Sequence, residues 1–423
     1  MPEETSLRRE LGKWDLTAIG VNQVIGGSVF LMPALLAAQV GSTSWLAVGL
    51  VGLLSLLIAL NFAEAGSRFD GTGGAYLYTR AAFGRFPSFE VGWMLWVTRA
   101  TSWASVINGL ADVMGYYWPG LAAGATRVAL IAGLILTIMV LNLRGIRQSA
   151  WVVNALTIGK LVPLAIFIGL GLPHVAWGAL GPGQALTWNQ LSTSALFLIF
   201  AYGGYEVVPV PAGEALDPKR DVPFAMVTTI VIVTVVMTLV QVVALGTLPG
   251  LASSKTPLAD AALLLFGAAG ALMMTSGAAV SMTGNNVGQA LNGSRSLFAL
   301  AEQGDLPGIF GHVHPRFRTP DFAIVFTSLV SLALALSGSF STLAASSAVA
   351  RLVVYAGTCA SVLALRRRSR AAFTIPFGPA VPVVALAVSL AILYGASPLQ
   401  REVGAAALVI GAALYAIARR RSR

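Results

Sequence analysis

Long apolar runs, each bounded by charged residues, proline or glycine, follow one another along the whole chain. A helix needs about 20 mostly apolar residues to cross a membrane, and most of the runs approach or exceed this length. The pattern therefore predicts twelve transmembrane helices, at residues 15–39, 44–66, 88–117, 125–143, 150–171, 193–213, 223–247, 258–300, 321–338, 342–365, 379–396 and 403–419. The eighth run is too long for one straight span, so we expect a tilted or bent helix there.

The composition excludes a soluble fold. Of the 423 residues, 56% are hydrophobic and only 10% are charged, whereas soluble domains carry about 25% charged residues. So few charged residues could not cover that much apolar surface in water. The chain is therefore predicted to be an all-α polytopic membrane protein. Cys359 is the single cysteine, and the chain has 3 histidines. We therefore expect no disulfide framework, no metal centre and no cofactor.

The basic residues indicate the orientation in the membrane. The net charge is +10, but lysine and arginine are concentrated in short loops between apolar runs, which indicates topology rather than nucleic-acid binding. Of the 27 basic residues, 21 fall on one side, and only Arg127, Lys255 and Arg401 fall on the other. Because cytoplasmic loops collect lysine and arginine, we place both termini in the cytoplasm and the protein in the plasma membrane, as in a bacterial inner membrane.

Two predicted helices are interrupted near the middle of the membrane. The first contains Gly26-Gly27 after two polar residues, and the sixth contains Gly203-Gly204 before Glu206. Glycine pairs also occur where membrane helices pack closely. These two breaks, however, occupy the first span of each five-span half, a pattern typical of secondary transporters. Freed N–H groups suit a carboxylate and freed carbonyls suit an ammonium group, so the paired breaks fit a zwitterionic α-amino acid.

Four segments carry short motifs: residues 25–30 with Pro33, residues 63–84, residues 200–206 with 217–220, and residues 294–320. In this order and at these spacings they resemble the amino acid–polyamine–organocation (APC) superfamily of amino acid permeases over nearly the whole chain. The resemblance implies a LeuT-type fold, a 5+5 inverted repeat with helices 1 and 6 unwound, followed by two C-terminal helices. The expected parts are a cytoplasmic tail at 1–13, repeats at 14–171 and 190–368, and helices 11 and 12 with a cytoplasmic tail at 379–423.

The same resemblance implies a substrate site at the two breaks. The amides of Gly27 and Ser28 are expected to bind the substrate carboxylate, with Gly26 permitting the turn. Ser28 departs from the usual glycine of the family and adds a hydroxyl donor. The aromatic ring of Phe200 stands where the family places a gate. The substrate ammonium is expected at the carbonyls of Val24, Phe200, Ala201 and Gly203.

Lys160 lies near the middle of the fifth predicted span, where a charged side chain is costly. Sodium-coupled members of the family hold Na⁺ between spans one, five and eight, and this chain resembles a subset in which a lysine replaces that ion. We expect Lys160 to contact carbonyls near Gly26 and polar residues of the eighth span such as Ser281. Transport would then be sodium-independent, and proton-coupled if Lys160 exchanges its proton. The alternative is a structural lysine.

Four other ionisable residues fall inside predicted spans. Arg99 and Asp112 lie too far apart on one helix to pair with each other, so we expect structural partners on other elements. Glu206 is expected to hold the unwound segment rather than to touch substrate. We place Arg351 towards the outer end of its span, from where it can snorkel to the interface.

We interpret the chain as a secondary active transporter of α-amino acids that works by alternating access. Neutral substrates are expected, because no acidic side chain falls in the predicted pocket. An amine or polyamine transporter and an amino acid exchanger are the alternatives. A membrane enzyme is a remote one, because the sequence shows no metal-ligand spacing and no Ser-His-Asp set. The expected partners are the amino acid substrate and the lipid bilayer, without nucleic acid.

Overall fold

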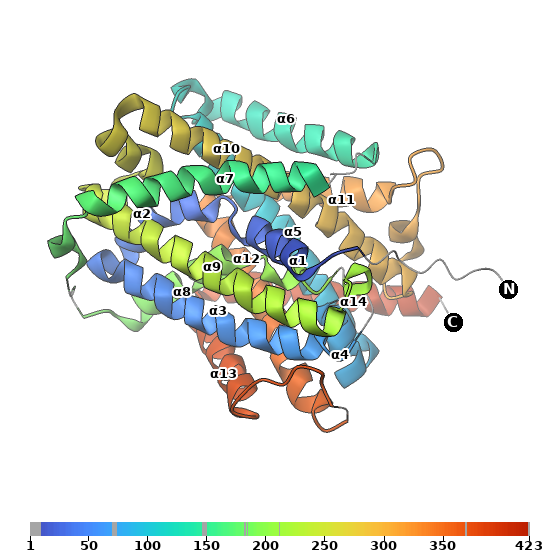
Figure 1. The fold of residues 1–423 in the computed structure, drawn as a ribbon. Helices are drawn as coiled ribbons and strands as arrows, with labels where there is room; N and C mark the ends of the chain where they lie inside the picture. Colours follow the sequence, from blue (N-terminus) through green and yellow to red (C-terminus); the bar gives the residue numbers. More distant parts are fainter. Residues whose placement is uncertain are drawn as a thin grey trace.

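The computed structural model describes residues 10–421, except 70–73, 146–149, 182, 184, 211 and 369. Most of the tail predicted at 1–13 therefore lies outside the described residues. The named elements of the described part are all helices (Figure 1). The α-helices are α1 (Lys13–Val24), α2 (Ser28–Val40), α3 (Ser44–Gly66), α4 (Ala75–Phe83), α5 (Arg85–Met114), α6 (Gly124–Leu143), α7 (Ala150–Gly171), α8 (Trp188–Tyr202), α9 (Pro218–Thr247), α10 (Pro257–Glu302), α11 (Asp321–Ser337), α12 (Phe340–Leu365), α13 (Ala380–Tyr394) and α14 (Pro398–Arg421).

Most predicted runs coincide with these helices, and the first run is divided between α1 and α2. The eighth run forms α10, which bends at Gly267, where φ is 67° and ψ is −160°. The boundary predicted for the sixth run, 193–213, is wrong. Its helix α8 already begins at Trp188 and ends at Tyr202, and only the 3₁₀ turns η5 (Tyr205–Val207) and η6 (Ala212–Glu214) follow.

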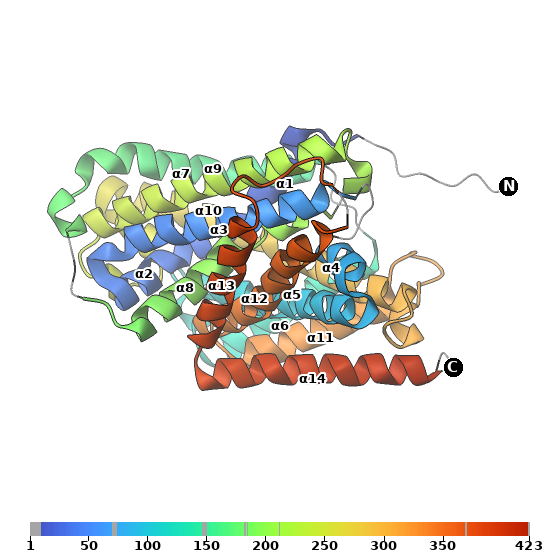
Figure 2. The same ribbon diagram turned by 90° about the horizontal axis from the view of Figure 1, so that it is seen from below.

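The sequence pattern did not predict α4. This nine-residue helix lies between α3 and α5, and glycines with positive φ flank it, Gly74 at 56° and Gly84 at 85°. It is too short to span a membrane, and it lies at the same end of the bundle as the C-terminal end of α14 in both views (Figures 1 and 2). The apolar pattern missed it because a helix of 9 residues that contains Arg80 has no long apolar run.

Helix contacts pair the two halves of the chain. Helix α10 packs against α7 and α6, and the corresponding helix α5 packs against α12 and α11. Likewise α1 contacts α9 and α7, and α8 contacts α3 and α12. Each contact therefore has a counterpart when the helices of one half are exchanged for those of the other. The last two helices, α13 and α14, pack against α12 from outside this arrangement.

The outer faces of several helices are apolar. On α6, Val128 and Leu136 are 49% and 40% exposed, and on α14, Val409 and Ile410 are 68% and 54% exposed. Large apolar side chains exposed along whole helices indicate contact with lipid rather than water. Within the described residues, six helical stretches are long and apolar enough to cross a membrane by length and composition, while α11 and α13 are apolar but shorter.

Candidate functional site

The first helix is broken between Val24 and Ser28, where α1 ends and α2 begins. The amide of Gly26 donates to the carbonyl of Val24 at 2.7 Å, which closes a tight turn. A Cβ on Gly26 would lie 2.7 Å from Nδ2 of Asn285, so glycine at this position lets the Asn285 side chain approach the turn closely. The carbonyls of this break consequently point to neighbouring helices instead of along α1.

The second break follows α8. Gly203 is extended, with φ −68° and ψ 143°, and Gly204 has φ 134°, a conformation that glycine alone adopts readily. A Cβ on Gly204 would lie within 2.9 Å of the backbone of Gln23 and Val24. The two breaks therefore touch each other directly, backbone against backbone.

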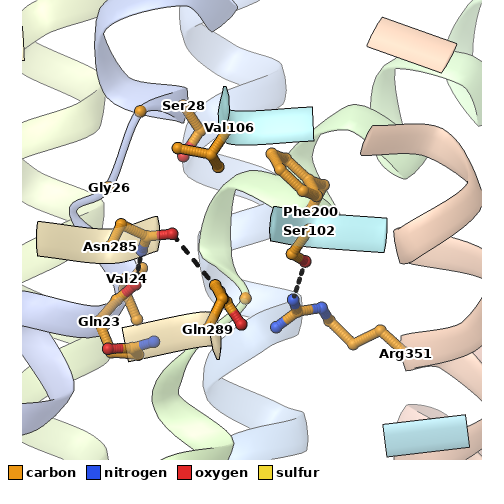
Figure 3. A pocket seen from close by; sticks show the side chains of 12 residues that line it. Gln23, Val24, Gly26, Ser28, Ser102, Val106, Phe200, Asn285, Gln289 and Arg351 are labelled. Carbon is orange, nitrogen blue, oxygen red and sulfur yellow. Dashed lines mark hydrogen bonds between the residues drawn. The ribbon is translucent and has the colours of Figure 1, made fainter. Parts of the chain in front are cut away.

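One small cavity lies where the breaks meet (Figure 3). Six of the seven residues predicted to bind substrate line it: Val24, Gly26, Gly27, Ser28, Phe200 and Gly203. The seventh, Ala201, lies beside it, and its carbonyl accepts a 3.4 Å hydrogen bond from the Ser28 hydroxyl. The volume is about 10 Å³, the room of a single water molecule. The lining must therefore move apart before a larger molecule can enter.

Three of the four predicted carbonyl acceptors already have a partner, and that of Ala201 is the Ser28 hydroxyl. The carbonyl of Val24 accepts from Gly26, and that of Phe200 accepts from the amide of Gly203 at 3.0 Å. A carbonyl oxygen carries two lone pairs, so each of these can still accept one more donor. The ring of Phe200 is buried, and it packs edge-on against Phe340 with 5.9 Å between the centroids.

Lys160 lies beneath the first break, on α7. Its Nζ donates to the carbonyls of Asn22 and Ile25, both at 2.8 Å, and its side chain is buried. The hydroxyl of Ser281 on α10 donates to the carbonyls of Ile25 and Gly26, at 3.2 and 3.0 Å. The ammonium and the hydroxyl thus converge on carbonyls that the break has released.

A buried charge cluster lies beside the second break. Glu206 accepts from the Gly204 amide at 2.8 Å and from Nη1 of Arg351 at 2.5 Å, and its carboxylate lies 3.4 Å from Nη2 of Arg99. The hydroxyl of Tyr355 also donates to it, at 3.3 Å. All three charged side chains are at most 2% exposed. Glu206 therefore holds the unwound backbone and two guanidinium groups together.

The placement of Arg351 at the outer end of its span is wrong. The residue lies in the middle of α12, buried, with its guanidinium against Gly203. It does not snorkel, because Glu206 pairs with it inside the protein. Asp112 pairs with Arg127 on α6 at 2.7 Å in a half-buried position away from this cluster.

Sequence reasoning missed five lining residues with polar side chains: Gln23, Ser102, Asn285, Gln289 and Arg351. The amide of Asn285 donates to the carbonyl of Gln23 at 3.2 Å, and that of Gln289 donates to Asn285 at 3.5 Å. A signal for the α10 residues was present. Ser281, Asn285 and Gln289 recur every four residues in an apolar helix, which puts them on one face.

A larger hollow of about 340 Å³ opens on the side of the basic loops. Arg99 lines this hollow, and Arg351 lines the small cavity. The charge cluster therefore separates the two spaces. At the far rim, Tyr76 donates to Asp305 at 3.0 Å. Burial and the nearby charge of Asp305 raise the pKa of Tyr76 to about 12, so its phenol stays protonated and can keep donating. Among the described residues, no group of three or more His, Cys, Asp or Glu side chains could hold a metal ion.

The fold is a bundle of apolar helices, with one small cavity where two broken helices meet. Residues 11–410 match the model of the amino acid permease family, and the chain belongs to this family. It is therefore a multi-pass membrane transporter of the APC superfamily, and not an enzyme.

Curated relatives cover most of the chain. The chain is 28% identical over 412 residues to the serine/threonine exchanger SteT of Bacillus subtilis, covering 92% of each protein. It is 30% identical over 430 residues to an uncharacterized transporter of Mycobacterium tuberculosis, covering 99% of this chain and 93% of the relative. It is 25% identical over 408 residues to the branched-chain amino acid permease BcaP of Bacillus subtilis, covering 90% and 87%.

Proposed function

We propose that this protein is a secondary active transporter that moves α-amino acids across the bacterial inner membrane by alternating access. The observation that carries the proposal is the meeting of two broken helices at one buried cavity. Irregular backbone at membrane depth persists only where protein or a cavity satisfies it. A serine/threonine exchanger and a branched-chain amino acid permease among the relatives support amino acids as the substrate class.

The substrate binds with its two charged groups at the backbone of the breaks. The amides of Gly27 and Ser28, at the N-terminus of α2, take the carboxylate, because this end of a helix favours negative charge. The carbonyls of Val24, Phe200, Ala201 and Gly203 take the ammonium. The position of six of these seven named residues around one cavity, counting Gly26 at the turn, supports this pose.

The chain consists of two related halves, and access alternates through movement of helices that both halves contribute. The halves are helices α1–α7 and α8–α12, close to the predicted limits 14–171 and 190–368, and the paired contacts support an inverted repeat between them. The chain crosses the membrane twelve times, with both termini in the cytoplasm. The hollow on the side of the basic loops forms the inner vestibule, and the charge cluster closes it from the substrate cavity.

Substrate analogues without the charged carboxylate test the proposed binding pose. Amino acid methyl esters and amides should bind purified protein more weakly than the parent amino acids by about 2–3 kcal/mol, because a charged hydrogen-bond partner is lost. Competition against a radiolabelled amino acid measures this difference. Equal affinity of ester and acid would contradict the pose, and uptake of amines without a carboxylate would favour the polyamine alternative.

Lys160 takes the place of a sodium ion in this mechanism. Its contacts with two carbonyls of the first break support this role. Uptake into proteoliposomes should therefore persist when choline replaces sodium. If Lys160 also exchanges its proton during the cycle, an inward proton gradient should raise uptake. Strict dependence on sodium would exclude the role. Uptake that needs neither sodium nor a proton gradient would leave Lys160 as an ion mimic alone.

A further inference from the structure

The substrate cavity contains a positively charged side chain that the backbone pose does not use. Arg351 reaches it from α12, and Figure 3 shows its guanidinium pointing towards Gln289, with Ser102 beside it. Its Nη2 donates to the Ser102 hydroxyl at 3.4 Å. Gly203 makes room for it, because a Cβ there would overlap the guanidinium. The second break therefore also admits this charge to the cavity.

The charge cluster is not neutral. Arg99 and Arg351 share the single carboxylate of Glu206, and among the described residues no other carboxylate pairs with either arginine. One positive charge in excess remains beside the cavity, on side chains that are at most 2% exposed. Uncompensated buried charge is costly, so a ligand that brings a negative charge to this position gains more here than in solvent.

Unsatisfied polar groups of the lining point to the same ligand chemistry. Within the described residues, two lining side chains have buried atoms without a partner, Nε of Arg351 and Nε2 of Gln23. Both are donors. A buried donor without an acceptor destabilises its surroundings by the loss of hydration. The lining thus offers hydrogen bonds to an acceptor, beyond those the backbone offers to the amino and carboxyl groups of a substrate.

We propose that the cavity selects α-amino acids whose side chain ends in a carboxylate, as in aspartate and glutamate, and that Arg351 is the specificity-determining residue. The α-carboxylate and the ammonium bind the two breaks, and the side-chain carboxylate binds Arg351 and balances the excess charge. This inference rests on the proposed function. It replaces the expectation of a substrate with a neutral side chain. That expectation rested on the lack of acidic side chains in the predicted pocket and did not take Arg351 into account.

Isosteric pairs of ligands test the proposal on the intact, detergent-purified protein. Aspartate and glutamate should compete against a radiolabelled amino acid at least about tenfold better than asparagine and glutamine, since only the acids place a full negative charge against the arginine. Alanine and serine complete the series. If no α-amino acid binds, the proposed function itself fails. If amino acids bind but the acids have no advantage over their amides, only this inference fails.

Two variants locate the preference at Arg351. Arg351→Gln should reduce the ratio of acid to amide affinity to within about threefold of one, because its charge-assisted bonds are lost. The double variant Arg351→Gln with Glu206→Gln keeps one excess charge, on Arg99, but removes the arginine from the cavity. It should lose the preference as well. A preference that survives in either variant would overturn the role of Arg351, and the ligand series on the parent protein decides the case if both variants misfold.

Discussion

At each broken helix, a charged side chain binds backbone groups that the break leaves without helical partners. The side chain is positively charged at the first break and negatively charged at the second. At the first break, released carbonyls receive the ammonium of Lys160 and the hydroxyl of Ser281. At the second, a released amide donates to the carboxylate of Glu206. Among the described residues, the hydrogen-bond partners of Lys160 are backbone carbonyls, whereas two guanidinium groups surround the carboxylate of Glu206. The two halves are arranged alike, but the side chains at their two breaks therefore carry opposite charges.

The difference shows which break is able to change its charge without losing its partners. Removing a proton from Lys160 leaves an amine with two N–H groups, which can still donate to the carbonyls of Asn22 and Ile25. Removing the charge of Glu206 leaves two buried guanidinium groups facing each other without a counter-charge. The first break is suited to coupling, and the second is suited to holding the structure together. Three substitutions test this contrast, from the largest expected loss of stability to the smallest.

Glu206→Gln should destabilise the protein most. Breaking a buried ion pair by removing one partner costs about 3–5 kcal/mol, and here two arginines lose their partner at once. Thermal unfolding in detergent, followed by circular dichroism, measures the loss. Asp217→Asn is the matched control, because its pair with Arg220 is exposed, with 3.8 Å between the atoms, and exposed pairs contribute at most about 1 kcal/mol. Similar melting of the two variants would contradict the structural role of Glu206.

Lys160→Ala should have an intermediate effect on stability and a larger effect on transport. The variant leaves the carbonyl of Asn22 without the lysine donor and that of Ile25 with Ser281 alone, at a cost of about 1–3 kcal/mol. Uptake should cease while substrate binding persists. Lys255→Ala, at an exposed position of the loop before α10, should behave like the parent protein. Normal uptake by Lys160→Ala would exclude both the coupling role and the ion-mimic role.

Gly27→Val should change stability least and still abolish transport. A Cβ at this position would lie 3.0 Å from Cγ of Met282, a flexible side chain that can move, so the fold should survive. The branched side chain would fill the approach to the amides that we propose to bind the carboxylate. Gly49→Val is the control, because a Cβ there meets nothing within 4 Å. Uptake by Gly27→Val at the parent rate would mean that the first break serves only the packing of helices and does not bind substrate.

The fold was accessible from the sequence because bilayer length and apolar runs constrain helices strongly. The limits of α3, α6 and α7 follow from hydrophobicity alone, within a residue. The end of α8 was not predicted, because Gly203, Gly204 and two prolines were taken as a local defect in a helix that would resume. Helix α4 was missed because it does not cross the membrane and has no long apolar run.

The two helix breaks could be predicted from the sequence, but the side chains that converge beside them could not. Glycine pairs such as Gly26-Gly27 mark a break within one segment, so the sequence shows them directly. The meeting of Arg99, Glu206 and Arg351 depends on the packing of α5, η5 and α12, which no local pattern contains. Arg351 was assigned to the interface because lone charges in apolar runs usually reach water, whereas its partner lies 145 positions away along the chain.

The contact at Gly204 has a mechanical consequence. Its α-carbon abuts the backbone of Gln23 and Val24, and no side chain lies between the two segments to act as a cushion. Protein interiors resist compression, so a displacement of α1 passes directly to the segment after α8. We therefore expect α1 and the segment after α8 to move together, whichever of the two the substrate displaces first.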